Sequence, residues 1–482
     1  MFHGGSFVTD AKSFGELNFG HAQLGDKRRT TRLVKLVDQM CLRPGGTLPQ
    51  KFRRPADLQA FYRLMRKKDV THEAILDAHR QATYLRIEEN KTPVLILHDT
   101  TELEYTTHKS LDGLGQIGSG KRRGYITHNS LAVDPKTRDV LGLCSQVLHR
   151  RVKASKSETQ AQRKQRASRE SLLWLRGVES LPARRQLIDV CDRGADIFEF
   201  LEHEVASGRR FVIRSSYDRC IFLGHDEPRE SESGKLRQYG RTLPQAGAWT
   251  LQVTSKSEMR SPKRRGKKKL VVRKKRDANM AVAFAPVQIK PSQYHHGGGP
   301  LKVWIVRVWE VDPPQGQERL EWTLITNEPV CNFEAAYRVV GWYECRWIIE
   351  EYHKGMKTGC QIESPQFTSE DRLQPAIALL SVVTLTLLQL RQASRRPDAK
   401  TRRATHVIGA SYVEVLSLWR HKKIKLDWSI HDFYYALARL GGHQNRKHDH
   451  PPGWQVIWEG WKELLPMVIG YDVAKSKYKK CG

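Results

Sequence analysis

The order of apolar runs between residues 94 and 214 is the feature that most limits how this chain can fold. Three runs follow one another, the last two joined by a short turn, an arrangement that favours antiparallel strand pairing. Two more come after helical patterns at 156–177 and 195–206, as expected for strands added in parallel. The sequence thus predicts an α/β fold with five strands in this region: Val94–Leu97, Tyr125–Val133, Val140–Leu148, Leu187–Cys191 and Phe211–Arg214.

Two aspartates stand where these predicted strands end. Asp99 follows the first strand and Asp192 follows the fourth. The carboxyl ends of buried strands are a usual place for ligands in α/β folds. Taken singly, either residue also fits a loop aspartate that caps the following segment. The strand and helix order is that of a ribonuclease-H-like fold, in which Asp99 and Asp192 would lie on the first and fourth strands.

A third carboxylate lies in a patterned segment further along the chain. Tyr343, Arg346, Glu350 and Lys357 follow at steps of three, four and seven, which predicts one shared helix face, and His353 joins it. A carboxylate framed by a phenol and cations suits a metal ion beside DNA phosphates. The alternative is a solvated stripe in which Glu350 pairs with Arg346 and Lys354. Three carboxylates can hold two divalent ions.

These motifs resemble the DDE cut-and-paste transposases of bacterial insertion sequences, in the group that includes the transposase of transposon five. The likeness runs nearly end to end. The chain departs from the family at Gly194, where Glu is usual, and near Ile348, where Arg is usual, and neither position carries the metal. Further matching segments are Leu24–Arg29, Asp99–Thr101, Cys191–Arg193, Ala195–Ile197, Arg210–Ser215, Ala438–Gly442 and Trp458–Trp461.

The resemblance implies a chemistry and a set of partners. It implies an enzyme that binds terminal inverted repeats, cuts the ends through a hairpin intermediate and joins their 3′-hydroxyls to target DNA. Its catalytic residues would be Asp99, Asp192 and Glu350, holding two Mg²⁺ ions for which Mn²⁺ can substitute. A homodimer would form in the synaptic complex on double-stranded DNA.

The resemblance also implies DNA contacts around the metal site. Trp322 would stack on a base flipped out of the duplex, although a core aromatic on a strand is the alternative. The expected contacts to phosphates come from Tyr343, Arg346 and Lys357, with Arg214, Lys354 and His353 as weaker candidates.

The chain divides into three predicted domains. Residues 1–70 form a basic helical module, interpreted as a reader of DNA ends or as a helical pair packed on the core. Residues 71–368 form the catalytic domain, interrupted by an inserted β-domain at about 216–329. Residues 369–482 are helical. Three tryptophans there, Trp454, Trp458 and Trp461, fit a plain core or, by the resemblance, a dimer interface.

The inserted region carries a strongly cationic run. Residues 262–269 include Lys267, Lys268 and Lys269, and 273–276 repeat the pattern. Charge runs are usually solvated, and here tracking of phosphates is the favoured interpretation. Five strand-like runs surround it: Trp249–Val253, Leu270–Arg273, Ala281–Phe284, Val303–Val311 and Glu321–Thr326.

Composition indicates a nucleic-acid partner independently of these motifs. The chain has 82 Lys plus Arg against 52 Asp plus Glu, a formal charge of +30. A polyanion is the expected partner of so basic a chain. The eight cysteines are scattered without a Cys-x-x-Cys pair, which indicates no zinc site or disulfide framework. We expect a cytoplasmic, nucleoid-associated protein without a membrane partner, whose run Ala376–Leu390 is a buried helix.

Two other classes of function remain open from the sequence. A ribonuclease-H-like nuclease or resolvase would share the carboxylates and magnesium, but it has little use for the inserted β-domain. An inactive DNA-binding relative acting as a regulator would be expected to lose a carboxylate, and all three are present.

Overall fold

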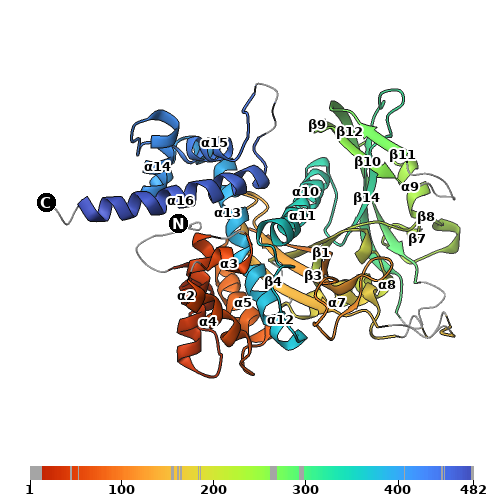
Figure 1. The fold of residues 1–482 in the computed structure, drawn as a ribbon. Helices are drawn as coiled ribbons and strands as arrows, with labels where there is room; N and C mark the ends of the chain where they lie inside the picture. Colours follow the sequence, from red (N-terminus) through yellow and green to blue (C-terminus); the bar gives the residue numbers. More distant parts are fainter. Residues whose placement is uncertain are drawn as a thin grey trace. The chain divides into compact units, whose positions relative to one another are not determined.

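The computed structural model describes residues 13–478 apart from 44–45, 53, 153–156, 160–161, 163–165, 183, 185, 261–268, 292–297, 407, 447–448 and 450. The chain folds into two compact units (Figure 1). One comprises residues 1–181 with 347–482, and the other residues 182–346. The mixed α/β class predicted from the sequence is confirmed. The predicted domain boundaries at residues 70 and 368 stay predictions.

The first unit begins with a set of helices. These are α1 (Phe14–Phe19), α2 (Lys27–Leu42), α3 (Leu48–Lys51), α4 (Pro55–Met65) and α5 (His72–Glu89). The Asp26 side chain caps α2 by accepting the backbone N–H of Arg28 at 2.8 Å. Pro55 opens α4, where its missing N–H costs no hydrogen bond. The helices predicted in the N-terminal region are thereby confirmed for the described residues.

An antiparallel sheet forms the centre of the first unit. Strand β3 (Arg123–Val133) pairs with β1 (Val94–Glu104), β4 (Val140–His149) and the short β2 (Gly115–Gln116). The three predicted strands are confirmed, but β1 extends well past Leu97. It continues because its pairing with β3 runs to the Glu104–Gly124 pair.

Helices cover both faces of this sheet. On one face, the Gln146 side chain of β4 forms a hydrogen bond of 3.1 Å with His72 of α5. It forms another, of 2.9 Å, with Ser381 of α12 (Glu370–Val383). On the other face, α7 (Leu173–Glu179) packs against β3. Helix α5 lies so close to β4 that a Cβ at Gly142 would stand 2.0 Å from the Thr83 hydroxyl oxygen.

The long helix predicted at 156–177 is confirmed only at its end, where residues 173–177 belong to α7, and is wrong at 157–159 and 166–169. Residues 157–159 and 166–169 form turns and irregular chain, and a 3-10 turn at Glu170–Leu172 leads into α7. The remaining positions lie outside the described residues, except for residue 162. The segment is polar without an apolar stripe, so a helix there would gain little from burying one face.

The C-terminal part of the first unit is helical. The predicted apolar helix is split at Thr384 into α12 and α13 (Leu385–Arg395). Helices α14 (Ala410–His421), α15 (Ile430–Leu440) and α16 (Trp454–Tyr478) share a core that includes Trp458 and Trp461, as the core interpretation predicts. Residues 370–395 are long and apolar enough to cross a membrane, but 82% of their most apolar window is buried inside the protein, as in a core helix.

The second unit is built on a mixed sheet. Strands β5 (Leu187–Cys191) and β6 (Arg210–Arg214) are parallel, and the predicted helix between them, α8 (Phe198–Ala206), begins three residues late because Arg193–Ala195 forms a 3-10 turn. The antiparallel strands that follow are β7 (Cys220–Leu223), β8 (Ser233–Lys235), β9 (Gly247–Val253), β12 (Arg276–Ile289), β13 (Leu301–Glu310) and β14 (Glu321–Thr326), with a separate hairpin of β10 (Lys256–Arg260) and β11 (Lys269–Arg273).

The predicted β-rich insert is therefore present, but it does not form a sheet of its own. Strand β14 pairs with β6, so the strands of the insert continue the sheet of the parallel pair. Helix α9 (Leu236–Thr242) lies within the insert, and α10 (Phe333–Glu344) follows it. The cationic run at 262–269 lies outside the described residues, except for Lys269 at the start of β11.

Candidate functional site

Asp99 lies in the middle of β1 and not at its end, which corrects the sequence prediction. The fully buried part of the strand nevertheless stops at His98, and Asp99 is half-buried. Its Oδ1 accepts the backbone N–H of Thr100 at 2.8 Å. Asp99 stands directly opposite Asn129 of β3, so the two side chains project from the same face of the sheet.

Helix α11 (Trp347–Lys354) lies over that same face. The Asn129 Nδ2 is 3.0 Å from the Nε2 of His353, and α11 packs against β1. Glu350 precedes His353 by one helical turn, so it shares a side of α11 with that residue. Glu350 is half-buried. The structure thus places Asp99 and the helix bearing Glu350 on one side of the sheet.

A chain of hydrogen bonds fixes the Asn129 side chain. Gln146 donates from Nε2 to the Asn129 Oδ1 at 2.8 Å, and its Oε1 is 3.1 Å from the Nε2 of His72. With its oxygen used in this way, Asn129 turns its amide N–H towards His353, whose Nε2 is then the acceptor. Burial lowers the pKa of His72, which favours the neutral ring in this network.

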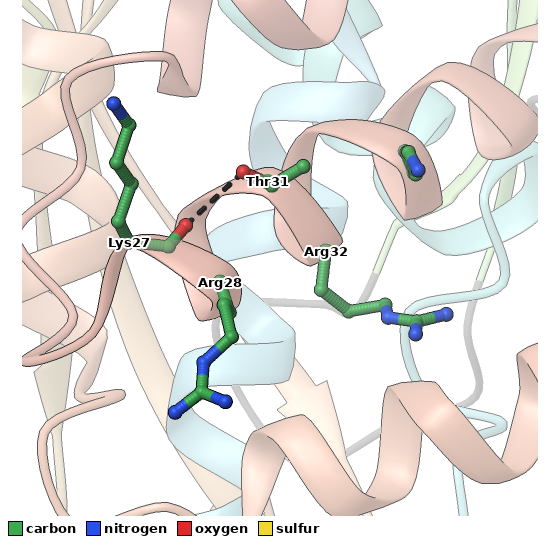
Figure 2. A pocket seen from close by; sticks show the side chains of 5 residues that line it. Lys27, Arg28, Thr31 and Arg32 are labelled. Carbon is green, nitrogen blue, oxygen red and sulfur yellow. Dashed lines mark hydrogen bonds between the residues drawn. The ribbon is translucent and has the colours of Figure 1, made fainter.

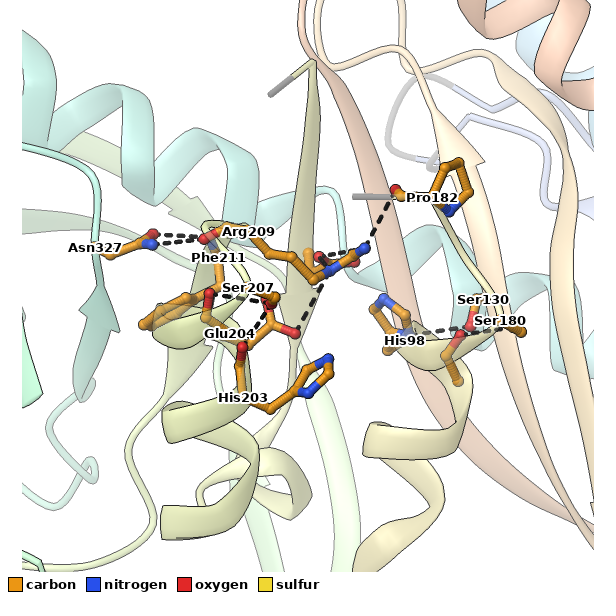
Figure 3. A network of polar contacts seen from close by, with 12 residues as sticks. His98, Ser130, Ser180, Pro182, His203, Glu204, Ser207, Arg209, Phe211 and Asn327 are labelled. Carbon is orange, nitrogen blue, oxygen red and sulfur yellow. Dashed lines mark hydrogen bonds and ion pairs between the residues drawn. The ribbon is translucent and has the colours of Figure 1, made fainter. Parts of the chain in front are cut away.

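The opposite face behind Asp99 holds a buried histidine pair. The rings of His98 and His128 stack with centroids 5.6 Å apart, and the Ser130 hydroxyl is 3.0 Å from the His98 Nδ1. Figure 3 shows His98 and Ser130 side by side. Burial, followed by the effects of His98 and His353, holds the pKa of His128 well below its usual range. Trp174 of α7 closes the cluster edge-on to His128.

The segment from Tyr343 to Lys357 is not one continuous helix, so the predicted single face is wrong. Helix α10 ends at Glu344. A tight turn follows, in which the backbone N–H of Arg346 donates to the backbone carbonyl of Tyr343. After α11, residues Gly355–Gly359 form a π-helical turn that carries Lys357. A change of helix type moves side chains off an α-helical face. The single-face prediction assumed 3.6 residues per turn throughout.

The members of the pattern therefore divide into smaller groups. Tyr343 and Arg346 are both buried, with the Arg346 guanidinium 5.9 Å from the Tyr343 ring centre. Lys357 helps to lower the pKa of Glu104, after the hydrogen bonds from Arg122 and Thr106. Lys354 is exposed.

Asp192 follows β5 in the second unit and caps the 3-10 turn, accepting the Gly194 N–H at 2.8 Å. The capping role predicted as the alternative is therefore real, and it leaves the carboxylate half-buried. The parallel register pairs Cys191 with Ile213, so Asp192 and Arg214 follow at adjacent strand ends. Partial desolvation, followed by the nearby Arg214 cation, lowers the pKa of Arg193.

Trp322 lies on β14, opposite Val308, and is half-buried. Its indole N–H is buried and has no hydrogen-bond partner among the described residues. A half-buried ring is compatible with either predicted role, so the stacking of a base stays a prediction.

A cationic surface lies on the exposed side of α2. It borders an open cavity of about 330 Å³ lined by Lys27, Arg28, Thr31, Arg32 and Lys35, shown in Figure 2. The apolar side of the same helix is buried through Leu33, Leu36, Val37 and Met40. A helix with this division presents its positive charges to a partner in solution.

Residues 11–70 match the family described as transposase DNA-binding. The match covers α1–α4 and includes the cationic surface of α2. It supports a DNA-binding transposase with DNA as its partner. Of the two interpretations of the N-terminal helices, it favours the one in which they bind DNA.

The predicted metal ligands are divided between the two units. Among the described residues, no three His, Cys, Asp or Glu side chains cluster closely enough to hold a metal ion. Asp99 and Glu350 belong to the first unit, and Asp192 belongs to the second. The half-buried carboxylates of the first unit are the hard oxygen donors that Mg²⁺ prefers, so this pair fits such an ion chemically.

Proposed function

We propose that this protein is a cut-and-paste DNA transposase of the DDE type with a ribonuclease-H-like catalytic core. The observation that carries the proposal is the Asn129–His353 contact, which seats the helix of Glu350 on the Asp99 side of the sheet. The transposase DNA-binding match at residues 11–70 supplies the substrate class. A transposase of the proposed type needs both a DNA-binding module and a carboxylate site at the scissile phosphate.

The three carboxylates would act together on that phosphate. Asp99 and Glu350 would contribute from the first unit, and Asp192 would complete the set from the second. Two Mg²⁺ ions, or Mn²⁺ in their place, would supply an activated oxygen nucleophile and a stabilised leaving oxygen when bound there. Asn129 would keep α11 in place, so that the Glu350 side chain is positioned before DNA arrives.

The surrounding cations would hold the DNA. Arg214 at the end of β6, and Arg346 beside Tyr343, would bind phosphates near Asp192, while Lys357 would act near Glu350. Trp322 would receive a base flipped out during formation of the hairpin, and stacking of this kind is worth roughly 1–3 kcal/mol per base. Pairing of the two element ends would take place in a homodimer.

A strand-joining assay tests the proposal. Linear duplexes would end in the inverted repeats that flank the gene, and matched duplexes would carry scrambled ends. We expect magnesium-dependent cutting at the repeat ends, followed by their covalent joining to a supercoiled plasmid, with neither product from scrambled ends. Cutting without joining would identify a nuclease or resolvase, and binding without either would identify an inactive relative.

A further inference from the structure

A buried aspartate anchors the loop that follows β6 in the second unit. Asp196 is 0% exposed, and its Oδ2 accepts the backbone N–H groups of Ser216 at 2.6 Å and Tyr217 at 3.0 Å. Its Oδ1 accepts the Nε–H of Arg219 at 2.7 Å. A buried carboxylate that receives several charge-assisted or backbone hydrogen bonds fixes the geometry of its donors. The loop from Ser215 to Arg219 is therefore a rigid platform.

This loop holds an arginine of the insert in place. The Arg237 guanidinium donates to the Ser216 carbonyl at 2.6 Å, and the Arg237 backbone N–H donates to Asp218 at 2.8 Å. No carboxylate of the described residues pairs with that guanidinium. Arg237 is exposed, so its orientation is fixed while most of its donors remain available.

Arg241, four residues later on α9, differs in this respect. Its guanidinium pairs with both carboxylate oxygens of Glu321 at 3.3 Å. Its charge is thus partly offset by an acidic partner, which it shares with Arg307. The two arginines occupy the same short helix, but Arg241 already has a carboxylate partner and Arg237 has none among the described residues.

Arg237 belongs to a group of cations beside Asp192. Ser216, which it bonds, lies two residues beyond Arg214, and Arg214 stands at the strand end next to Asp192. Arg193 follows Asp192 directly. Three cations, Arg193, Arg214 and Arg237, thus lie on segments that meet at this strand end, and an anion bound there would offset their mutual repulsion.

We propose that Arg237, oriented by the loop that Asp196 anchors, binds a backbone phosphate of the DNA strand that runs past Asp192. The inference rests on the proposed function and deepens it, because it gives the β-rich insert a direct part in holding DNA. Asp196 is a positioning residue here, acting through Ser216 and Arg237.

Phosphate-by-phosphate neutralisation tests this contact. Duplexes ending in the flanking inverted repeats would carry a single uncharged methylphosphonate at successive positions around the cut site. Wild-type protein should lose roughly tenfold in affinity when the contacted phosphate is neutralised, as expected for a hydrogen bond to a charged group. Arg237→Ala should bind the unmodified duplex roughly tenfold more weakly and show no further loss at that one position.

Matched variants separate the contact from general charge effects. Arg241→Ala should follow wild type at every position, and Arg237→Lys should recover part of the affinity. Asp196→Asn should reproduce the loss at the same position, and a melting curve would show whether it is folded. If it does not fold, the Arg237 variants decide the matter by themselves.

Two results would overturn the inference. One is an Arg237→Ala protein as sensitive as wild type to neutralisation at every position. The other is stabilisation by inorganic phosphate that Arg237→Ala abolishes while DNA affinity stays unchanged, which would identify a site for a free anion. The strand-joining assay is independent of both, so failure of the proposed function and failure of this contact are distinguishable.

Discussion

At the scale of single residues, Glu204 is a carboxyl buried beside another carboxyl. Glu204 and Asp189 are both 0% exposed, and the one guanidinium between them, Arg209, lies 2.9 Å from Asp189 and 3.7 Å from Glu204. Figure 3 shows Glu204 and Arg209. Burial, followed by the charge of Asp189, raises the pKa of Glu204 well above its usual range. Burial thus favours the protonated form of Glu204 in the folded protein more than in the unfolded chain.

This raised pKa predicts a loss of stability with rising pH. Because folded Glu204 holds its proton more tightly than unfolded Glu204, its stabilising contribution is complete below the unfolded pKa of about 4.5 and is lost as pH rises through the folded value. Glu204→Gln removes this titration. Melting temperatures measured from about pH 5 to 9 should fall more steeply for wild type than for the variant.

A neighbouring residue provides the control. Glu202→Gln, on the same helix and half-buried, should preserve the wild-type pH dependence. If the melting temperatures of wild type and Glu204→Gln change with pH in the same way over the whole range, Glu204 does not titrate in the folded protein.

The sequence was a good guide to some residues and a poor one to others. It placed Asp192 correctly at the end of β5, because a short apolar run before a charged residue is a local signal. It missed Asn129, although three adjacent polar residues in a buried strand, His128 to Ser130, could have drawn attention to it. It also missed Arg237, because the loop that orients it is fixed by Asp196, about forty residues away in the chain.

At the scale of elements, the contact of α7 with β3 leaves no space for a side chain. A Cβ at Gly177 would lie 2.5 Å from the His128 Nε2 and 3.3 Å from the Ser130 hydroxyl oxygen. Gly177→Ala should therefore destabilise the protein by about 1–3 kcal/mol through overpacking, measurable by urea denaturation. Gly341→Ala, in α10 with nothing within 4 Å, should instead stabilise by about 0.5–1 kcal/mol.

The test depends on whether each substitution lowers or raises the free energy of unfolding. If Gly177→Ala also stabilises, α7 does not pack on the histidine pair as described.

Elements whose signals are local were predicted well, and their ends and interruptions were not. The strands follow from short apolar runs in the sequence. The break after Glu344 and the π-helical turn at Gly355–Gly359 are not contained in a 3.6-residue period. At Gly355, a Cβ would approach the Thr384 methyl group to 3.0 Å, so this turn depends on a distant helix.

At the scale of the whole molecule, composition and element order indicated a DNA-binding α/β protein from the sequence alone. The charge of +30 and the strand order needed no tertiary information. The continuation of the sheet from β6 into β14 could not be predicted, because the two strands are separated by more than a hundred residues and pair through only three positions. Long-range pairing of this kind leaves no periodic trace in the sequence.

The most direct test of the account measures cutting and binding together for three conservative variants. Asp99→Asn, Asp192→Asn and Glu350→Gln should each abolish cutting and joining of inverted-repeat ends in Mg²⁺. Their affinity for those ends should stay within about threefold of wild type, because phosphate contacts supply most of the binding. Glu334→Gln, at an exposed position in the first turn of α10, should remain active. Substantial cutting by any of the three variants would contradict the assignment of that carboxylate, and cutting by all three would contradict the account as a whole.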